Sequence, residues 1–258
     1  MTSSPPERRA LLFTAGGVRL ALRLTSVREI VTVPSGASEV EARGQRVPAV
    51  PLALALGLSA PPGPVAVLTE AVPPVALRVD AIEGIVDLST AEVFQLPART
   101  LLPQPAPFQG ALVREGVLSL ELALTSAGWV PLEAAAATWE PPPEGEVGAF
   151  PGRELIFERG GRSYAVPISL LLRVVESPRV FPVPLAPPAH RGLLYHERAI
   201  HPVFDLAGLY DGAPLPGEAL ALLLDAGGTA VAVLADRIAA AGAPAEVVRP
   251  AWDALFPA

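Results

Sequence analysis

The fold is decided by a stretch that occurs twice in the chain. Residues 12–34 read LFTAGGVRLALRLTSVREIVTVP, and residues 156–178 read IFERGGRSYAVPISLLLRVVESP. Residue 12 aligns with residue 156, and the offset of 144 then holds without a gap. Each copy has a phenylalanine, a Gly-Gly pair three residues later, an alternating run and a closing proline. Such internal similarity indicates a duplicated structural unit.

Two further segments repeat at an offset of 154. PAVPLALAL from Pro48 matches PVFDLAGLY from Pro202, and EVFQLPARTLLP from Glu92 matches EVVRPAWDALFP from Glu246. The extra ten residues of the second copy fall within residues 179–192, as expected of a surface loop. We therefore predict module 1 over residues 10–131, a Pro/Ala/Gly linker over 132–152, and module 2 over 153–258.

The residue pattern within each copy predicts an all-β fold. Val18–Leu24 and Val117–Leu124 alternate apolar and polar residues, which is typical of strands with one buried face, so Ser119 and Glu121 are expected opposite the leucines. Paired glycines at 16–17, 160–161 and 227–228 predict hairpin turns. Strands also fit 65–68, 75–79, 220–224 and 231–234, with short helices only at Leu52–Leu56 and Ser89–Val93.

The composition excludes several classes of function. The 258-residue chain is 51% hydrophobic, has no cysteine and carries a net charge of −7. No disulfide framework or thiolate chemistry is possible without cysteine. Negative charge disfavours nucleic acid, and no apolar run is long enough for membrane insertion, so we predict a cytoplasmic protein.

No residues stand out for catalysis, and we predict no enzyme, no cofactor and no metal site. The three histidines, His190, His196 and His201, lack the spacing of a helical zinc motif. The carboxylates Asp80, Asp205 and Asp236 fall at predicted strand ends, where capping of turns is their usual role.

The order of motifs resembles the CheW-like domain of bacterial chemotaxis coupling proteins. An opening hairpin leads to Val-Arg-Glu-Ile-Val at 27–31, then Arg-Gly-Gln-Arg-Val-Pro at 43–48, then Val-Asp at 79–80. In the second copy, residues 192–206 align without gaps with the family segment "GVxNLRGxVVPVxDLR". The resemblance implies two SH3-like five-stranded β-barrels per module and a non-enzymatic adaptor that couples a histidine kinase regulatory domain to a chemoreceptor tip.

The resemblance also implies partner-binding residues. In module 1 these are Val27, Arg28, Glu29, Arg43 and Gly44; in module 2 they are Leu171, Arg173, Glu197 and Arg198. Arg173 stands where module 1 has Glu29, and Glu197-Arg198 stands where the family has Arg-Gly. Since like charges across an interface cost several kcal/mol, we expect module 2 not to bind the same receptor tip.

Module 2 is expected to lack its last strand pair, because module 1 continues past Pro103 whereas module 2 stops after Pro257. The exposed sheet edge would then be a docking site for another chain, and a homo-oligomer would be one outcome. Two other functions stay open: a structural subunit of a derived assembly, such as one for motility, that has lost receptor binding, and a ligand-binding barrel with a pocket between the modules.

Overall fold

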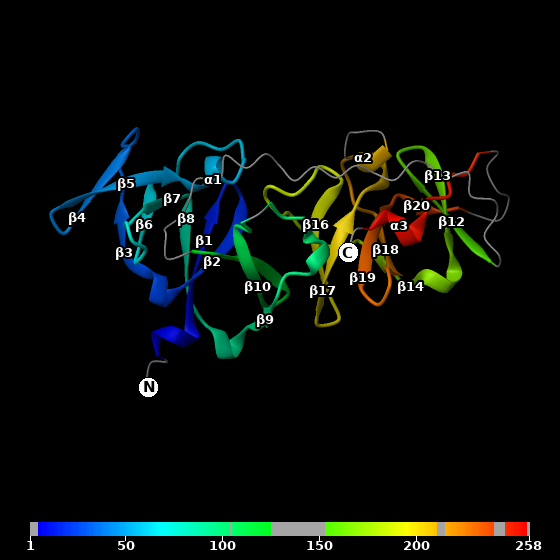
Figure 1. The fold of residues 1–258 in the computed structure, drawn as a ribbon, viewed down its shortest axis with the longest axis horizontal. Coiled ribbons are helices and arrows are strands. Elements are labelled where there is room, and N and C mark those ends of the chain that lie inside the picture. The colour runs from blue at the N-terminus through cyan, green and yellow to red at the C-terminus, as the bar shows by residue number, and fades with distance from the viewer. Residues whose placement is uncertain (1–4, 104, 125–152, 211–214, 240–245, 257–258) are drawn as a thin grey trace. The chain divides into compact units, whose positions relative to one another are not determined.

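The computed structural model of the chain describes residues 5–103, 105–124, 153–210, 215–239 and 246–256 (Figure 1). Contacts divide it into two compact units. Unit 1 comprises Met1–Leu96 with Leu102–Ala136, and unit 2 comprises Pro97–Leu101 with Ala137–Ala258. The predicted linker, residues 132–152, lies outside these ranges, and the strand predicted over Val117–Leu124 ends at Leu122.

Unit 1 contains a six-stranded sheet with the order β8-β1-β2-β11-β10-β9. Its strands are antiparallel except for the parallel pair of β2 and β11. The Gly16-Gly17 turn, with φ angles of 59° and 77°, joins the first hairpin as predicted. The elements are η1 (Pro6–Arg8), β1 (Arg9–Ala15), β2 (Val18–Arg23), η2 (Leu24–Ser26), β8 (Ala81–Asp87), η3 (Leu88–Thr90), β9 (Glu92–Phe94), β10 (Phe108–Arg114) and β11 (Val117–Leu122).

A second sheet of unit 1 has five strands in the order β3-β6-β7-β5-β4. Apolar side chains of this sheet, including Val33, Val47 and Leu68, form their own buried cluster. The elements are β3 (Val27–Thr32), β4 (Glu39–Ala42), β5 (Gln45–Pro51), α1 (Leu52–Ala55), β6 (Val65–Thr69) and β7 (Ala76–Val79).

Unit 2 repeats the second sheet and only part of the first. The strand order β14-β18-β19-β17-β16 corresponds to β3-β6-β7-β5-β4, and β15, from the longer loop, adds a sixth strand. Its counterpart of the first sheet has three strands, β13-β12-β20. The strands are β12 (Glu154–Arg159), β13 (Arg162–Pro167), β14 (Leu171–Glu176), β15 (Val180–Phe181), β16 (His190–His196), β17 (Ala199–Phe204), β18 (Leu220–Asp225), β19 (Ala230–Ala235) and β20 (Arg237–Ile238); the helices are η4 (Ala98–Thr100), η5 (Ile168–Leu170), α2 (Leu206–Tyr210) and α3 (Trp252–Leu255). The all-β duplication is thus confirmed.

The edge of β13 is occupied by the C-terminal segment of the same chain. Val248 accepts a backbone hydrogen bond from Ala165 N at 2.9 Å and donates one to Ser163 O at 2.8 Å. Trp252 Nε1 donates to Ala165 O at 3.0 Å, and Trp252 packs in the buried core of unit 2, where Leu101 is also packed. The hypothesis that another chain docks at this edge finds no support here, because the hydrogen-bonding groups of Ser163 and Ala165 are already used.

Three predictions about local structure are wrong or hold only in part. Of the helix predicted at Ser89–Val93, only Ser89 and Thr90 are helical, in the 3₁₀ helix η3: the Asp87 carboxylate accepts from Ser89 N at 2.9 Å and caps η3, after which the chain enters β9. Helices α2 and α3 form where the sequence predicted none. Ser119 and Glu121 are buried like the leucines beside them, because β11 has side chains packed on both faces. The helix expected at Leu52–Leu56 is confirmed as α1.

Candidate functional site

The predicted partner-binding residues of module 1 form one surface, which we call the β3 surface: Val27, Arg28, Glu29, Arg43 and Gly44. Strands β3 and β4 stand at opposite ends of the five-stranded sheet, and Arg43 follows β4 in a two-residue turn. Arg43 Nε lies 3.8 Å from Glu29 Oε2. The ion pair shows that the sheet curls until its end strands meet, as in a barrel.

Local backbone geometry explains how these side chains are presented. Arg43 and Gly44 have φ angles of 50° and 76°, the left-handed conformation that a two-residue hairpin turn requires. On β3, the register with β6 shifts between Val27 and Glu29, so Arg28 occupies a β-bulge. The Arg28 guanidinium donates to the Glu70 carboxylate at 3.2 and 3.3 Å. Arg28 is therefore held beside the Glu29–Arg43 pair rather than in it.

Module 2 has the equivalent surface with inverted charges, and we call it the β14 surface: Leu171, Arg173, Glu197 and Arg198. Arg173 of β14 pairs with Glu197 in the β16–β17 turn. Glu197 and Arg198 have φ angles of 49° and 62°, so this turn keeps its geometry without glycine. A register shift between Leu171 and Arg173 repeats the bulge, and the residue in it, Leu172, is 57% exposed.

The two charge reversals between the modules compensate each other, because the two residues that change sign form one ion pair in each module. Glu29 aligns with Arg173 and Arg43 with Glu197, and each module keeps an attractive pair of opposite polarity. The sequence showed both charge reversals but did not show that the two residues are in contact. The signal for that contact was that both residues change sign together between the repeats. Exposed ion pairs contribute about 0–1 kcal/mol to folding, so the polarity itself has little effect on stability.

A buried cation in unit 2 was missed by sequence reasoning. Arg159 is fully buried and binds Asp205 through Nε at 3.1 Å and Nη2 at 2.7 Å, while its Nη1 donates to Asp236 at 2.7 Å. Burial alone would lower the pKa of Arg159, but the hydrogen bonds to Asp205 and Asp236 outweigh it and the pKa is raised. Asp205 also caps α2 by accepting from Ala207 N, as expected of a strand-end carboxylate. Because the cluster is buried, its role is structural.

The three histidines do not converge. His190 is buried edge-on against Phe204, with ring centroids 5.2 Å apart, and burial lowers its pKa to about 4. Burial also lowers the pKa of His201, whereas His196 Nε2 lies 4.0 Å from the Glu197 carboxylate. Within the described ranges, no group of three or more histidine, cysteine, aspartate or glutamate side chains could hold a metal ion. No helix in those ranges is both long and apolar enough to cross a membrane.

Comparisons with known proteins show the family of the chain. The CheW-like domain family matches residues 9–125 and again residues 154–241. The chain therefore belongs to the CheW-like domain family, whose members include scaffold and adaptor proteins of the chemotaxis type. A solved structure, the scaffolding protein TtCheW from Thermoanaerobacter tengcongensis, is 15% identical, with a TM-score of 0.38 over 46% of this chain and 90% of that chain. A search of curated proteins found no match.

Proposed function

We propose that this protein is a non-enzymatic, cytoplasmic adaptor that couples the regulatory domain of a histidine kinase to chemoreceptors or related partners. The observation that carries the proposal is the juxtaposition of Glu29 and Arg43, which the family resemblance placed on the partner-binding surface and which the fold brings to 3.8 Å. Both side chains are substantially exposed and project from a bulged strand and a tight turn. Such fixed backbone geometry presents charges to a partner at little entropic cost.

The two modules should then have different partners. A receptor tip that places a cation near Glu29 and an anion near Arg43 would meet like charges on the β14 surface, where Arg173 and Glu197 stand. Like charges juxtaposed in an interface cost several kcal/mol. We therefore propose that module 1 contacts the receptor and that module 2 does not contact the same tip.

Exchanging the pair of module 1 tests this proposal. The double variant Glu29→Arg/Arg43→Glu keeps an attractive ion pair but gives the β3 surface the polarity of the β14 surface. We expect its affinity for a receptor-tip fragment to fall about tenfold or more, with unfolding free energy unchanged within about 1 kcal/mol. Affinity is measured by surface plasmon resonance, with the kinase regulatory domain as a second analyte.

The matched control is Arg173→Glu/Glu197→Arg, which gives the β14 surface the polarity of the β3 surface and should not weaken receptor-tip binding. Wild-type affinity in the first double variant would show that the pair only holds the barrel together. No binding of either analyte by the wild-type chain would refute the adaptor function.

A structural subunit that has lost receptor binding is the second candidate. It is favoured by Leu172, an exposed apolar side chain at the position that Arg28 has in module 1, because apolar contacts suit permanent assemblies. Binding of the kinase regulatory domain without binding of any receptor tip would support it.

A further inference from the structure

The six-stranded sheet of unit 1 curls around an interior that its side chains only partly fill. Leu112 of β10 and Val86 of β8 are four strands apart in the sheet order, yet they belong to one apolar cluster with Ala10 and Ala21. Barrels of this size are normally filled by their side chains. Beside this cluster the interior retains unfilled space.

That space is a cavity of about 290 Å³ that opens to solvent. Its floor is apolar and consists of Leu12, Val86, Ala91 and Leu112. Elsewhere on the same strands the interior is polar: the buried Glu121 accepts from Gln109 Nε2 at 2.8 Å and from Arg23 Nη2 at 3.1 Å.

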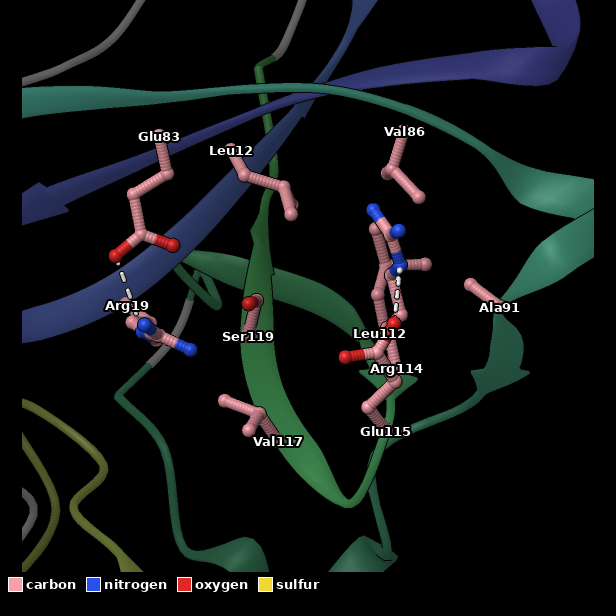
Figure 2. Close-up of a pocket in the computed structure, with 10 residues that line it drawn as sticks. All are labelled: Leu12, Arg19, Glu83, Val86, Ala91, Leu112, Arg114, Glu115, Val117 and Ser119. Atoms are coloured by element: carbon pink, nitrogen blue, oxygen red, sulfur yellow. Dashed lines mark ion pairs between the residues drawn. The ribbon is translucent and has the colours of Figure 1, made fainter.

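The mouth carries charges of both signs. Arg19 Nε lies 3.0 Å from Glu83 Oε1, and Arg114 Nε lies 3.5 Å from Glu115 Oε1. Figure 2 shows these two pairs on either side of Ser119. The pairs are solvated and contribute at most about 1 kcal/mol each, so a ligand can displace either partner at low cost.

We propose that this cavity binds a small zwitterion with an aliphatic side chain, of the size of leucine. The volume is at the lower end of ligand pockets, which suits a molecule of amino-acid size. The floor would take the aliphatic group, while the carboxylate pairs with Arg19 and the ammonium with Glu83. A rim of two arginines and two glutamates has no net charge, so it favours a ligand that is itself neutral overall.

The residues of this site are not repeated in module 2, and the site is independent of the adaptor function. In module 2, Ser163 aligns with Arg19, and Val248 bonds to the backbone of Ser163. The corresponding sheet has three strands in the described part of unit 2, and the cavity of about 310 Å³ beside it is lined instead by Gly161, Arg162, Ser163, Glu246 and Val248.

The test is calorimetric titration of the full chain with L-leucine, 4-methylpentanoate, which lacks the ammonium, and 3-methylbutylamine, which lacks the carboxylate. We expect saturable one-to-one binding of leucine below about 10 mM. Arg19→Gln and Glu83→Gln should each weaken leucine about fivefold or more. Arg19→Gln should weaken the acid but not the amine, and Glu83→Gln the amine but not the acid.

Arg237→Gln provides the matched control, because Arg237 forms a similar exposed pair with Glu158, at 2.8 Å, in unit 2. It should not change leucine affinity. Ala91→Leu, which fills the cavity from the floor, should abolish binding. Absence of saturable leucine binding, or equal affinity in the wild type and both rim variants, would overturn the proposal.

Discussion

The two modules repeat one strand order but are completed by different means. In module 1, β2 pairs in parallel with β11, so the hairpin of β10 and β11 completes the sheet. In module 2, the aligned strand β13 is bridged at Tyr164 by Val248, and α3 follows directly. In module 2, the segment around Val248 therefore lies beside β13 in the position that β11 has beside β2 in module 1.

The interiors differ as well. Where module 2 buries Arg159 against Asp205, the aligned residues of module 1 are Ala15 and Pro51. Both modules keep a carboxylate at the start of the next turn, Asp80 and Asp236, which accepts from the backbone of a glycine in the first hairpin. The comparison teaches that this position of the repeat accepts either an apolar or a charged side chain, provided that the buried charge is paired.

The largest expected effect is on unit 2 alone. Arg159→Ala leaves Asp205 buried without its main cationic partner, and the unfolding free energy of unit 2 should fall by about 3–5 kcal/mol. Hydrogen exchange of amides in β12 and β17 measures this, while exchange in β1 and β5 should not change.

The control is Arg237→Ala, which removes an arginine of the same unit from an exposed pair and should cost at most about 1 kcal/mol. Replacing both partners, as in Arg159→Met/Asp205→Leu, should be less costly than Arg159→Ala. If Arg159→Ala costs no more than Arg237→Ala, the buried cluster is not what distinguishes the modules.

The second-largest expected effect is a pH dependence of the unfolding free energy that comes from histidine. It concerns module 2 alone, because all three histidines lie there. His190 has a pKa of about 4 when folded and about 6.5 when unfolded, so the unfolded chain binds its proton first. Stability from neutral His190 is complete above pH 6.5 and is lost as the pH falls toward 4, by about 3 kcal/mol in total. Denaturant unfolding monitored by exchange in β16 and β17 checks this.

His190→Leu provides the reference, since it keeps an apolar side chain against Phe204 and cannot titrate. Subtracting its pH profile removes the contributions of His201 and the carboxylates. Parallel profiles for wild type and His190→Leu between pH 6.5 and 4 would show that His190 is not a buried neutral base.

The smallest effect concerns the segment at the edge of β13. Trp252→Phe keeps an aromatic ring in the core but removes the donor to Ala165 O, which should destabilise unit 2 by about 1–2 kcal/mol. The Ala165 amide, bonded to Val248 O, should exchange faster. Unchanged exchange at Ala165 would mean that α3 does not hold the segment in place.

Local patterns predicted much of the fold and part of the site. The alternation in residues 18–24 and the paired glycines predicted the hairpins, because strand period and turn conformation depend on neighbours in sequence. The same alternation was misleading for Ser119 and Glu121, since periodicity tells which residues share a face but not what packs against it. A turn-capping role for Asp205 was expected; its capping of helix α2 and its bond to Arg159, 46 residues away, were not.

The sequence by itself determined that the chain is a duplicated all-β protein of the CheW-like family, and which charges differ between the copies. Only the tertiary structure decided that Glu29 meets Arg43 as Arg173 meets Glu197, that Arg159 is neutralised by two aspartates, and that Val248 occupies the edge of β13. The physical reason is that repeats and turns are recorded in adjacent residues, whereas these contacts arise when the curled sheets bring distant segments together.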